Sequence, residues 1–339
     1  MANESLAVKY RPKTFEDMTE QNAIKNILEN QIKTKTFQHG YLFTGPSGTG
    51  KTTSARIFAS MINDGKGNPI EVDAASNSGV DNIRQIIEDA KRKPLDAEYK
   101  IFIVDECHSL SNGAWQALLK TLEEPPKFTI FIFCTTNPEK IPPTILSRVQ
   151  RYNFQKISNE GIVNRLISII KKENDVSNIH YDIDAMKYIA KVSSGGMRDA
   201  ITLLDKCLSL SHDLTLENVL KTIGAEDYST FITFLSALEG KVKVSAIRII
   251  ENVYNAGKDV KQFMKDFAKF VLEVEKYALY KNFDYISLPN TLENELEQLI
   301  EDSLFNVMDF VVSLNNQIKW DSDPKTLIEL SILIYCGKE

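Results

Sequence analysis

The sequence is poor in the features that mark secreted, disulfide-bonded and membrane-spanning chains. Its 339 residues contain only four cysteines, Cys107, Cys134, Cys207 and Cys336, which lie far apart and form no C-x-x-C pair. Such sparse cysteines are typical of proteins in a reducing cytosol. No apolar stretch approaches the length that crosses a bilayer. We therefore expect a soluble intracellular protein that makes no contact with a membrane.

Other absent features narrow the class of protein further. The N-terminus has neither a basic region nor an apolar core, so we expect no signal peptide. Internal repeats and low-complexity tails are also missing. The net charge of −6 argues against a broad DNA-coating surface, although a local site for DNA stays open. A hydrophobic content of 43% and 339 residues indicate an ordinary globular protein with two or three domains.

A glycine-rich loop is the most informative stretch. An apolar run at 41–43 predicts a buried strand, and a helix is predicted over 53–61. Between them lies a complete G-x-x-x-x-G-K-[ST] motif: Gly45, Pro46, Ser47, Gly48, Thr49, Gly50, Lys51 and Thr52. Backbone N–H groups of such a loop, and the helix opened by Thr53, point at phosphates. An ordinary glycine-rich turn is the alternative, but it does not explain the strand–loop–helix order.

Two acids complete the requirements of a nucleoside triphosphate site. The apolar strand predicted over 101–104 ends in Asp105 and Glu106. In α/β sheets, ligands bind beyond the carboxyl ends of the strands. We expect Lys51 to reach the β- and γ-phosphates, the Thr52 hydroxyl to ligate Mg²⁺, and Asp105 to hold Mg²⁺ through water. Glu106 would orient the attacking water. The alternative is a solvated strand end.

Further polar residues are weaker candidates. Thr136 follows the next predicted strand, 129–134, and its hydroxyl is within reach of a γ-phosphate there, although the segment also reads as a simple turn. Arg148 and Arg198 are candidates for neutralising phosphate charge. Cys107 and His108 suggest a metal, but no further ligands cluster with them, so a metal is disfavoured.

The pattern of the chain changes along its length. Strands alternate with helices over 40–154, which predicts a parallel α/β sheet, whereas residues 7–15, with Pro12, look irregular. Helices are predicted over 159–171, 182–192 and 197–209, and from 227 onward everything reads as helix. Apolar stripes there predict core packing rather than cofactor boxes: Phe231, Phe234, Leu235, Leu238; Val260, Phe263, Phe267, Phe270, Val274; Leu304, Val307, Val311, Leu314, Ile318.

Several stretches together resemble the AAA+ clamp-loader ATPases, most closely the bacterial DNA polymerase III gamma/tau subunits. They occur in family order at 9–15, 45–52, 73–84, 101–108, 117–126, 134–138, 145–148 and 196–200, with a further match at 321–330. The resemblance implies an α/β P-loop AAA+ fold with a RecA-like parallel sheet, a small helical lid and an all-α collar. The corresponding boundaries are 1–157, 158–224 and 225–339.

The same resemblance implies roles for particular residues. Thr136 falls on the family's first sensor and Arg198 on its second. Arg148 falls on the arginine of the Ser-Arg-Cys motif, which enters the neighbouring subunit's ATP site, although Val149 replaces the cysteine. Tyr10, Arg11 and Pro12 would lie near the adenine.

One departure from the family is larger. Gamma/tau subunits carry a four-cysteine zinc module after the phosphate-loop helix, and here only residues 63–69 span that gap, without cysteine. We therefore expect no zinc. A compact, phage-encoded form is compatible with this gap. Because the sequence ends after the collar, we also expect it to lack the tau extension that contacts helicase and polymerase.

The resemblance implies the ATPase subunit of a sliding-clamp loader in DNA replication. Its cofactors would be ATP and Mg²⁺, and its partners the other loader subunits of a five-membered ring, the clamp and primer–template DNA. It would work in the bacterial cytosol, or in the infected host cell if phage-encoded. Two alternatives are a non-hydrolysing, delta-prime-like subunit, which the intact phosphate loop opposes, and an AAA+ branch-migration motor, which normally adds a winged domain.

Overall fold

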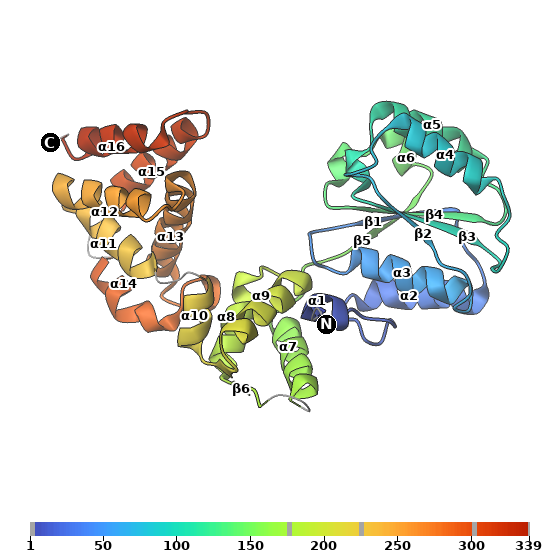
Figure 1. Cartoon of the computed structure of the whole chain (residues 1–339), viewed down its shortest axis with the longest axis horizontal. Helices are drawn as coiled ribbons and strands as arrows, with labels where there is room; N and C mark the ends of the chain where they lie inside the picture. The colour runs from blue at the N-terminus through green and yellow to red at the C-terminus, as the bar shows by residue number, and fades with distance from the viewer. Residues whose placement is uncertain (1–3, 175–177, 224–226, 300–303, 338–339) are drawn as a thin grey trace. The chain divides into compact units, whose positions relative to one another are not determined.

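The chain folds into two compact units. The computed structural model describes residues 4–174, 178–223, 227–299 and 304–337. The units are Met1–Thr215 and Leu216–Glu339, and each is described by itself below. The first contains a parallel sheet flanked by helices, and the described part of the second is helical (Figure 1). The predicted α/β core with a helical C-terminal part is confirmed, whereas the three-domain boundaries stay a prediction.

Five parallel strands form the sheet of the first unit. They are β1 (Gly40–Thr44), β2 (Ile70–Asp73), β3 (Lys100–Asp105), β4 (Thr129–Thr135) and β5 (Gln150–Asn153). Their order in space is β2-β3-β4-β1-β5. All residues of β1 and β4 are buried, as expected for central parallel strands covered on both faces. In the register, Thr44 lies opposite Thr135 and Val104 opposite Phe133, so the carboxyl ends of three strands meet at one edge.

Helices cover both faces of this sheet (Figure 1). They are α2 (Asn22–Thr34), α3 (Lys51–Ile62), α4 (Val80–Ala90), α5 (Asn112–Glu123) and α6 (Pro143–Leu146). Successive side chains of a strand point to opposite faces of the sheet, so the same strands contribute to two hydrophobic cores. Ile103 belongs to the core with Phe58 on the α2–α3 side, and Phe102 belongs to the core with Trp115 on the other side. Two short 3₁₀ helices, η1 (Cys107–Ser109) and η2 (Pro138–Lys140), follow β3 and β4.

The N-terminal segment differs from its prediction. A short helix, α1 (Leu6–Lys9), lies within the stretch expected to be irregular, and Pro12 follows it. Leu6 is buried, and its backbone N–H donates to the Asp205 carboxylate at 3.1 Å. Docking against a distant helix stabilises a segment too short to be helical by itself, and the local sequence carries no sign of this.

The rest of the first unit is a small helical subdomain. Its elements are α7 (Asn159–Glu173), β6 (His180–Tyr181), α8 (Ile183–Val192), α9 (Met197–Leu210) and β7 (Asp213–Leu214). The three helices match the predicted ones, whereas the sequence gives no sign of the two-residue parallel pairing of β6 with β7. Ser158 caps α7 by accepting a hydrogen bond from Gly161 N.

The second unit contains α10 (Leu216–Ile223), α11 (Asp227–Glu239), α12 (Lys243–Asn255), α13 (Val260–Tyr280), η3 (Phe283–Tyr285), η4 (Asn290–Leu292), α14 (Glu293–Leu299), α15 (Phe305–Ile318) and α16 (Pro324–Tyr335). Every residue of the three predicted apolar stripes is buried in one core, as expected for helix packing. Within it the rings of Phe234 and Phe267 lie edge to face, with centroids 4.7 Å apart. Among the described helices, none is long and apolar enough to cross a membrane.

Candidate active site

A cavity of about 380 Å³ opens in the first unit, where the phosphate loop, the end of β3 and the start of α9 converge. The predicted site residues that line it are Tyr10, Arg11, Pro12, Ser47, Gly48, Thr49, Gly50, Lys51, Thr52, Thr53, Asp105, Glu106 and Arg198. Gly45, Pro46 and Thr136 lie just behind this wall and contact residues on it. Of the residues predicted for the site, Arg148 is the one that the fold places elsewhere.

The phosphate loop needs glycine for two physical reasons. Gly45 and Gly48 have φ values of +142° and +72°, in the region that other residues rarely adopt. A Cβ at Gly48 would also lie 2.9 Å from Gly196 Cα, directly before α9. The Met197 N–H donates to the Gly48 carbonyl at 3.0 Å. The loop therefore touches the opening turn of α9, and glycine permits that approach.

Lys51 is held by the loop itself. Its Nζ donates to the carbonyl oxygens of Gly45 and Pro46, both at 2.8 Å, and the residue is only 6% exposed. Burial lowers the pKa of the Lys51 ammonium, and the nearby Cys134, Glu106 and Asp105 act in the opposite direction. The cation is thus partly desolvated and stands within the loop that would receive phosphates.

Thr52 and Asp105 meet at the bottom of the cavity. The Thr52 hydroxyl, in the first turn of α3, donates to Asp105 Oδ2 at 2.8 Å. The other carboxylate oxygen, Oδ1, accepts from the Glu106 N–H at 3.0 Å. A hydroxyl beside a carboxylate is the donor set that suits Mg²⁺, which prefers hard oxygen ligands and completes its shell with water and phosphate. These two side chains therefore fit the magnesium site predicted from the sequence.

Glu106 and Thr136 are brought together by the two strand ends. Glu106 directly follows β3 with φ 47°, in the left-handed region, and its carboxylate accepts from the Thr136 hydroxyl at 3.3 Å. Few residues other than glycine, asparagine and aspartate take this conformation, which is concentrated at functional sites. The predicted water-orienting acid and the predicted sensor thus share one hydrogen bond, 30 residues apart in sequence.

The two arginines differ in their placement. Arg198 lies in the first turn of α9 and lines the cavity. Arg148 follows α6, and its guanidinium forms an ion pair with Glu123 of α5 and donates to the Thr144 carbonyl. The sequence identifies both arginines but gives no sign of the contact with Glu123. Arg148 is thus absent from the cavity of its own chain.

Two arginines on the cavity wall, Arg56 and Arg165, are not among the residues predicted from the sequence. Arg165 of α7 donates to the Tyr10 carbonyl at 2.9 Å, and Arg56 of α3 pairs with Glu71 at 2.6 Å. The only local signal for Arg165 is that its own charge interrupts the apolar stripe of α7. Arg56 lies one helical turn after Thr52 and Thr53, and this spacing is a local signal for it. Arg165 has no such neighbour, because its part of the cavity forms only when distant segments meet.

The N-terminal segment is fastened to α7 beside the same cavity. Lys9 Nζ and the Tyr10 hydroxyl donate to the Glu173 carboxylate at 2.6 and 2.5 Å. Burial raises the pKa of Glu173, but the two hydrogen bonds and the Lys9 charge outweigh it, so the pKa lies below its usual value. Glu173 thus remains a carboxylate that holds Tyr10 against the wall where the resemblance places the adenine.

Cys107 and Cys134 are fully buried. Burial raises the pKa of both thiols, which favours their neutral form in the metal-free chain. Among the described residues no group of three or more His, Cys, Asp and Glu side chains is arranged to hold a metal ion. The absence of zinc stays a prediction, and these observations are compatible with it.

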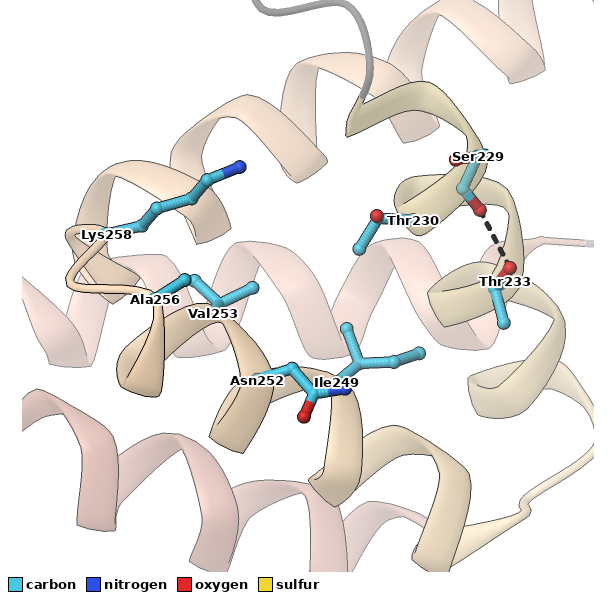
Figure 2. A pocket seen from close by; sticks show the side chains of 8 residues that line it. All are labelled: Ser229, Thr230, Thr233, Ile249, Asn252, Val253, Ala256 and Lys258. Atoms are coloured by element: carbon cyan, nitrogen blue, oxygen red, sulfur yellow. Dashed lines mark hydrogen bonds between the residues drawn. The ribbon is translucent and has the colours of Figure 1, made fainter.

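A second hollow lies in the C-terminal unit between α11 and α12. It has a volume of about 300 Å³, and its lining residues, shown in Figure 2, are Ser229, Thr230, Thr233, Ile249, Asn252, Val253, Ala256 and Lys258. The Thr233 hydroxyl donates to the Ser229 carbonyl at 2.7 Å. None of these eight residues is an acid, so the hollow lacks the groups that hydrolysis requires.

Two family models match the first unit. One is described as DNA polymerase III, delta subunit, and matches residues 20–79 and 69–158. The other is the ATPase lid domain of the DNA polymerase III clamp loader subunit, which matches residues 161–213. Together they span the α/β sheet and the small helical subdomain.

Curated relatives extend the match over the whole chain. The tau subunit of DNA polymerase III from Bacillus subtilis is 34% identical over 99% of this chain and 64% of its own length. The gamma/tau subunit of Mycoplasma genitalium is 35% identical over 86% and 51%. The shorter gamma subunit of Buchnera aphidicola subsp. Baizongia pistaciae is 36% identical over 70% and 69%. This chain thus spans about half to two thirds of the longer relatives.

Solved structures support the fold alone. The Thermotoga maritima RuvB Holliday junction branch migration motor superposes with a TM-score of 0.51 at 21% sequence identity, over 68% of this chain and 79% of that one. A mutant form of the same motor gives 0.52 with the same coverage. This likeness agrees with the predicted fold, a parallel α/β sheet followed by a small helical subdomain.

The loop geometry predicts a specific effect of Gly48→Ala. An alanine at position 48 would have to adopt a positive φ, and its methyl group would press against Gly196. We expect about 1–2 kcal/mol of lost stability from the backbone conformation and at least a roughly tenfold loss of ATP affinity from the displaced loop. Calorimetric titration with MgATP, together with thermal melts, measures both.

Gly65→Ala is the matched control, because Gly65 also has a positive φ of 76° but no neighbouring atom lies within 4 Å of the place a Cβ would take. It should lose a comparable amount of stability and keep ATP affinity. Unchanged ATP affinity in Gly48→Ala, with its stability lowered, would show that the loop tolerates the methyl group and does not close on phosphate.

Proposed function

The chain belongs to the DNA polymerase III gamma/tau family, and from this premise we propose that it is the ATP-hydrolysing subunit of a sliding-clamp loader. One observation carries the proposal: the phosphate loop, the acids Asp105 and Glu106, and the start of α9 surround a single cavity. ATP bound there would favour the ring that holds an open clamp on primer–template DNA. Hydrolysis would release the clamp around the DNA.

Several polar side chains in or beside the cavity would have a task in this reaction. Lys51 would exchange the carbonyls of Gly45 and Pro46 for the β- and γ-phosphates, which are stronger partners for a desolvated ammonium. Bound Mg²⁺ would neutralise phosphate charge, held by Thr52 and Asp105. Glu106 would orient the attacking water, with Thr136 beside it to sense the γ-phosphate.

The lid and the N-terminal segment would complete the site. Arg198, at the start of α9, would place a positive charge beside the γ-phosphate. Tyr10, Arg11 and Pro12, which line the same cavity, would cover the adenine. Because Gly48 already contacts the first turn of α9, a shift of the loop on nucleotide binding would be transmitted to the lid.

The family resemblance supports a proposal for the assembly. We propose a five-membered ring with other clamp-loader subunits, which acts on a sliding clamp and DNA in the cytosol of a bacterium or of an infected cell. Backbone amides and helix N-termini would follow the DNA backbone, which suits a chain of net charge −6. Neither zinc nor a membrane is required, and the short segment 63–69 leaves little room for a zinc module.

Two alternatives have a specific observation behind them. A matching family model is described as a delta subunit, which favours a non-hydrolysing role, and the RuvB likeness points to a branch-migration motor. The complete phosphate loop with Asp105 and Glu106 opposes the first. The likeness to RuvB is one of fold, and the helical second unit is unlike the winged domain expected of such a motor.

Lys51 and Glu106 should separate binding from hydrolysis. Lys51→Ala removes the cation that faces the phosphates and should abolish ATP binding, while Glu106→Gln should bind ATP normally and turn it over at least about a hundredfold more slowly. Affinity and single-turnover hydrolysis are measured separately for each variant, with Lys66→Ala, at an exposed lysine, as control. Equal losses of affinity in both variants would contradict this division of roles.

Arg148 should act on the ATP of a neighbouring subunit. Its guanidinium lies outside its own cavity, and an arginine finger contributes about 10³ to 10⁵ in rate in well-studied NTPases. With Thr136 and Arg198 in place, we expect Arg148→Ala to lose about 10² to 10³ of DNA- and clamp-stimulated turnover and to keep ATP affinity. Arg92→Ala, at an exposed arginine, serves as the control.

Mixed rings decide between action in trans and in cis. Chains carrying Arg148→Ala and chains carrying Lys51→Ala are combined, so that one intact Lys51 can face an intact Arg148 of the other chain. Turnover should recover in the mixture. If native mass spectrometry shows that mixed rings form and they stay inactive at every ratio, Arg148 acts in its own site or has a structural role.

A further inference from the structure

His108 lies between the two strand ends that carry the proposed hydrolytic groups. It belongs to η1, the single turn that follows β3, and its side chain is 15% exposed. The ring Nδ1 is 3.2 Å from Glu106 Oε2 and 3.1 Å from Oγ1 of Thr135, the last residue of β4. One imidazole nitrogen therefore touches the acid after β3 and the hydroxyl that ends β4.

The backbone fixes this placement. The left-handed conformation of Glu106 turns the chain sharply, and the Ser109 N–H closes the turn on the Glu106 carbonyl at 2.9 Å. Cys107 is fully buried between them, and burial raises the pKa of its thiol, which stays neutral. Cys107 anchors the turn in the core, and residues 106 and 108 consequently present their side chains to the end of β4.

The chemistry of the partners assigns the imidazole proton. The Glu106 carboxylate has lone pairs only, and its Oε2 already accepts from Thr136. Thr135 Oγ1 accepts from the Asn137 N–H at 3.0 Å. An Nδ1 without hydrogen would face the carboxylate with a lone pair, which is repulsive. An Nδ1–H is attracted by the Glu106 carboxylate and can also donate to Thr135 Oγ1, a hydroxyl that accepts or donates, so the carboxylate is the partner that favours this tautomer.

We propose that His108 is a positioning residue that holds the Glu106 carboxylate at the end of β4, so that the water-orienting acid and the sensor segment move together. The proposal rests on the hydrolytic role of Glu106 given above. Thr135, Thr136 and Asn137 form one continuous segment, and His108 joins that segment to Glu106. A γ-phosphate that displaces Thr136 would thereby also displace Glu106.

Substitutions at His108 test this through the split between binding and turnover. His108→Ala removes the donor and should lower single-turnover hydrolysis about tenfold, equivalent to about 1.4 kcal/mol, with ATP affinity and melting temperature nearly unchanged. His108→Asn can place an amide N–H where Nδ1 stands and should restore most of the rate. His212→Ala, at an exposed histidine, is the control.

Imidazole ¹⁵N NMR of the nucleotide-free chain gives a readout that does not depend on hydrolysis. The four histidines are labelled, and His108→Asn identifies the signal of His108. We expect its proton on Nδ1 and a shift of that signal in Glu106→Gln. This measurement remains informative even if the wild-type chain does not hydrolyse ATP, a result that would count against the proposed function alone.

Any of three results overturns the inference. The first is a His108 proton on Nε2 alone, with a signal that Glu106→Gln leaves in place. The second is hydrolysis by His108→Ala at the wild-type rate. The third is a loss of ATP affinity or stability in both His108 variants in parallel with the rate, which would make His108 a purely structural residue.

Discussion

Parallel pairing of β1, β3 and β4 is the constraint on which the site depends. With Thr44 opposite Thr135 and Val104 opposite Phe133, the residues that follow each strand must emerge at one edge. The phosphate loop, Asp105 with Glu106, and Thr136 are therefore neighbours although they are distant along the chain. The buried aromatic and aliphatic side chains of these strands fix that register, because a slip by one residue would turn the core side chains to the opposite face.

Contacts within the cavity give Lys51 and Thr52 hydrogen-bond partners from their own chain. Lys51 is bound by two carbonyls of its own loop, and the Thr52 hydroxyl is bound by Asp105. Phosphate would replace the two carbonyls as the partner of Lys51, and Mg²⁺ would replace the hydrogen bond between Thr52 and Asp105, so ligand binding would exchange existing interactions for new ones. The ion pair of Arg148 with Glu123 is partly exposed, and such pairs contribute about 0–1 kcal/mol, so it presents little barrier to displacement by a neighbouring subunit.

The parts of the fold and site that depend on local patterns are predictable from the sequence. The glycine-rich motif, the two acids after an apolar strand and the helical stripes each follow from spacing within a short window. Arg165, His108 and Glu123 are not recognisable as contributors, because their contacts join residues from 2 to 155 positions apart through folded geometry.

The N-terminal helix and the two arginines show the same limit. The helix α1 is not predictable, since Asp205, far along the chain, stabilises its first turn. The resemblance to a family assigns roles to Arg148 and Arg198, which local patterns alone leave as two surface arginines. In the fold, Arg198 lines the cavity, whereas Arg148, which follows α6, pairs with Glu123 of α5.

The central claim is that the phosphate loop, the strand-end acids and the start of α9 form one nucleotide site. Hydrogen–deuterium exchange of the chain, with and without Mg²⁺ and a non-hydrolysable ATP analogue, tests it most directly. The account predicts slower exchange at residues 45–53 and, in the same titration range, at 105–107 and 197–201. Protection of the loop without any change at 197–201, or no protection in any of the three segments, would contradict it.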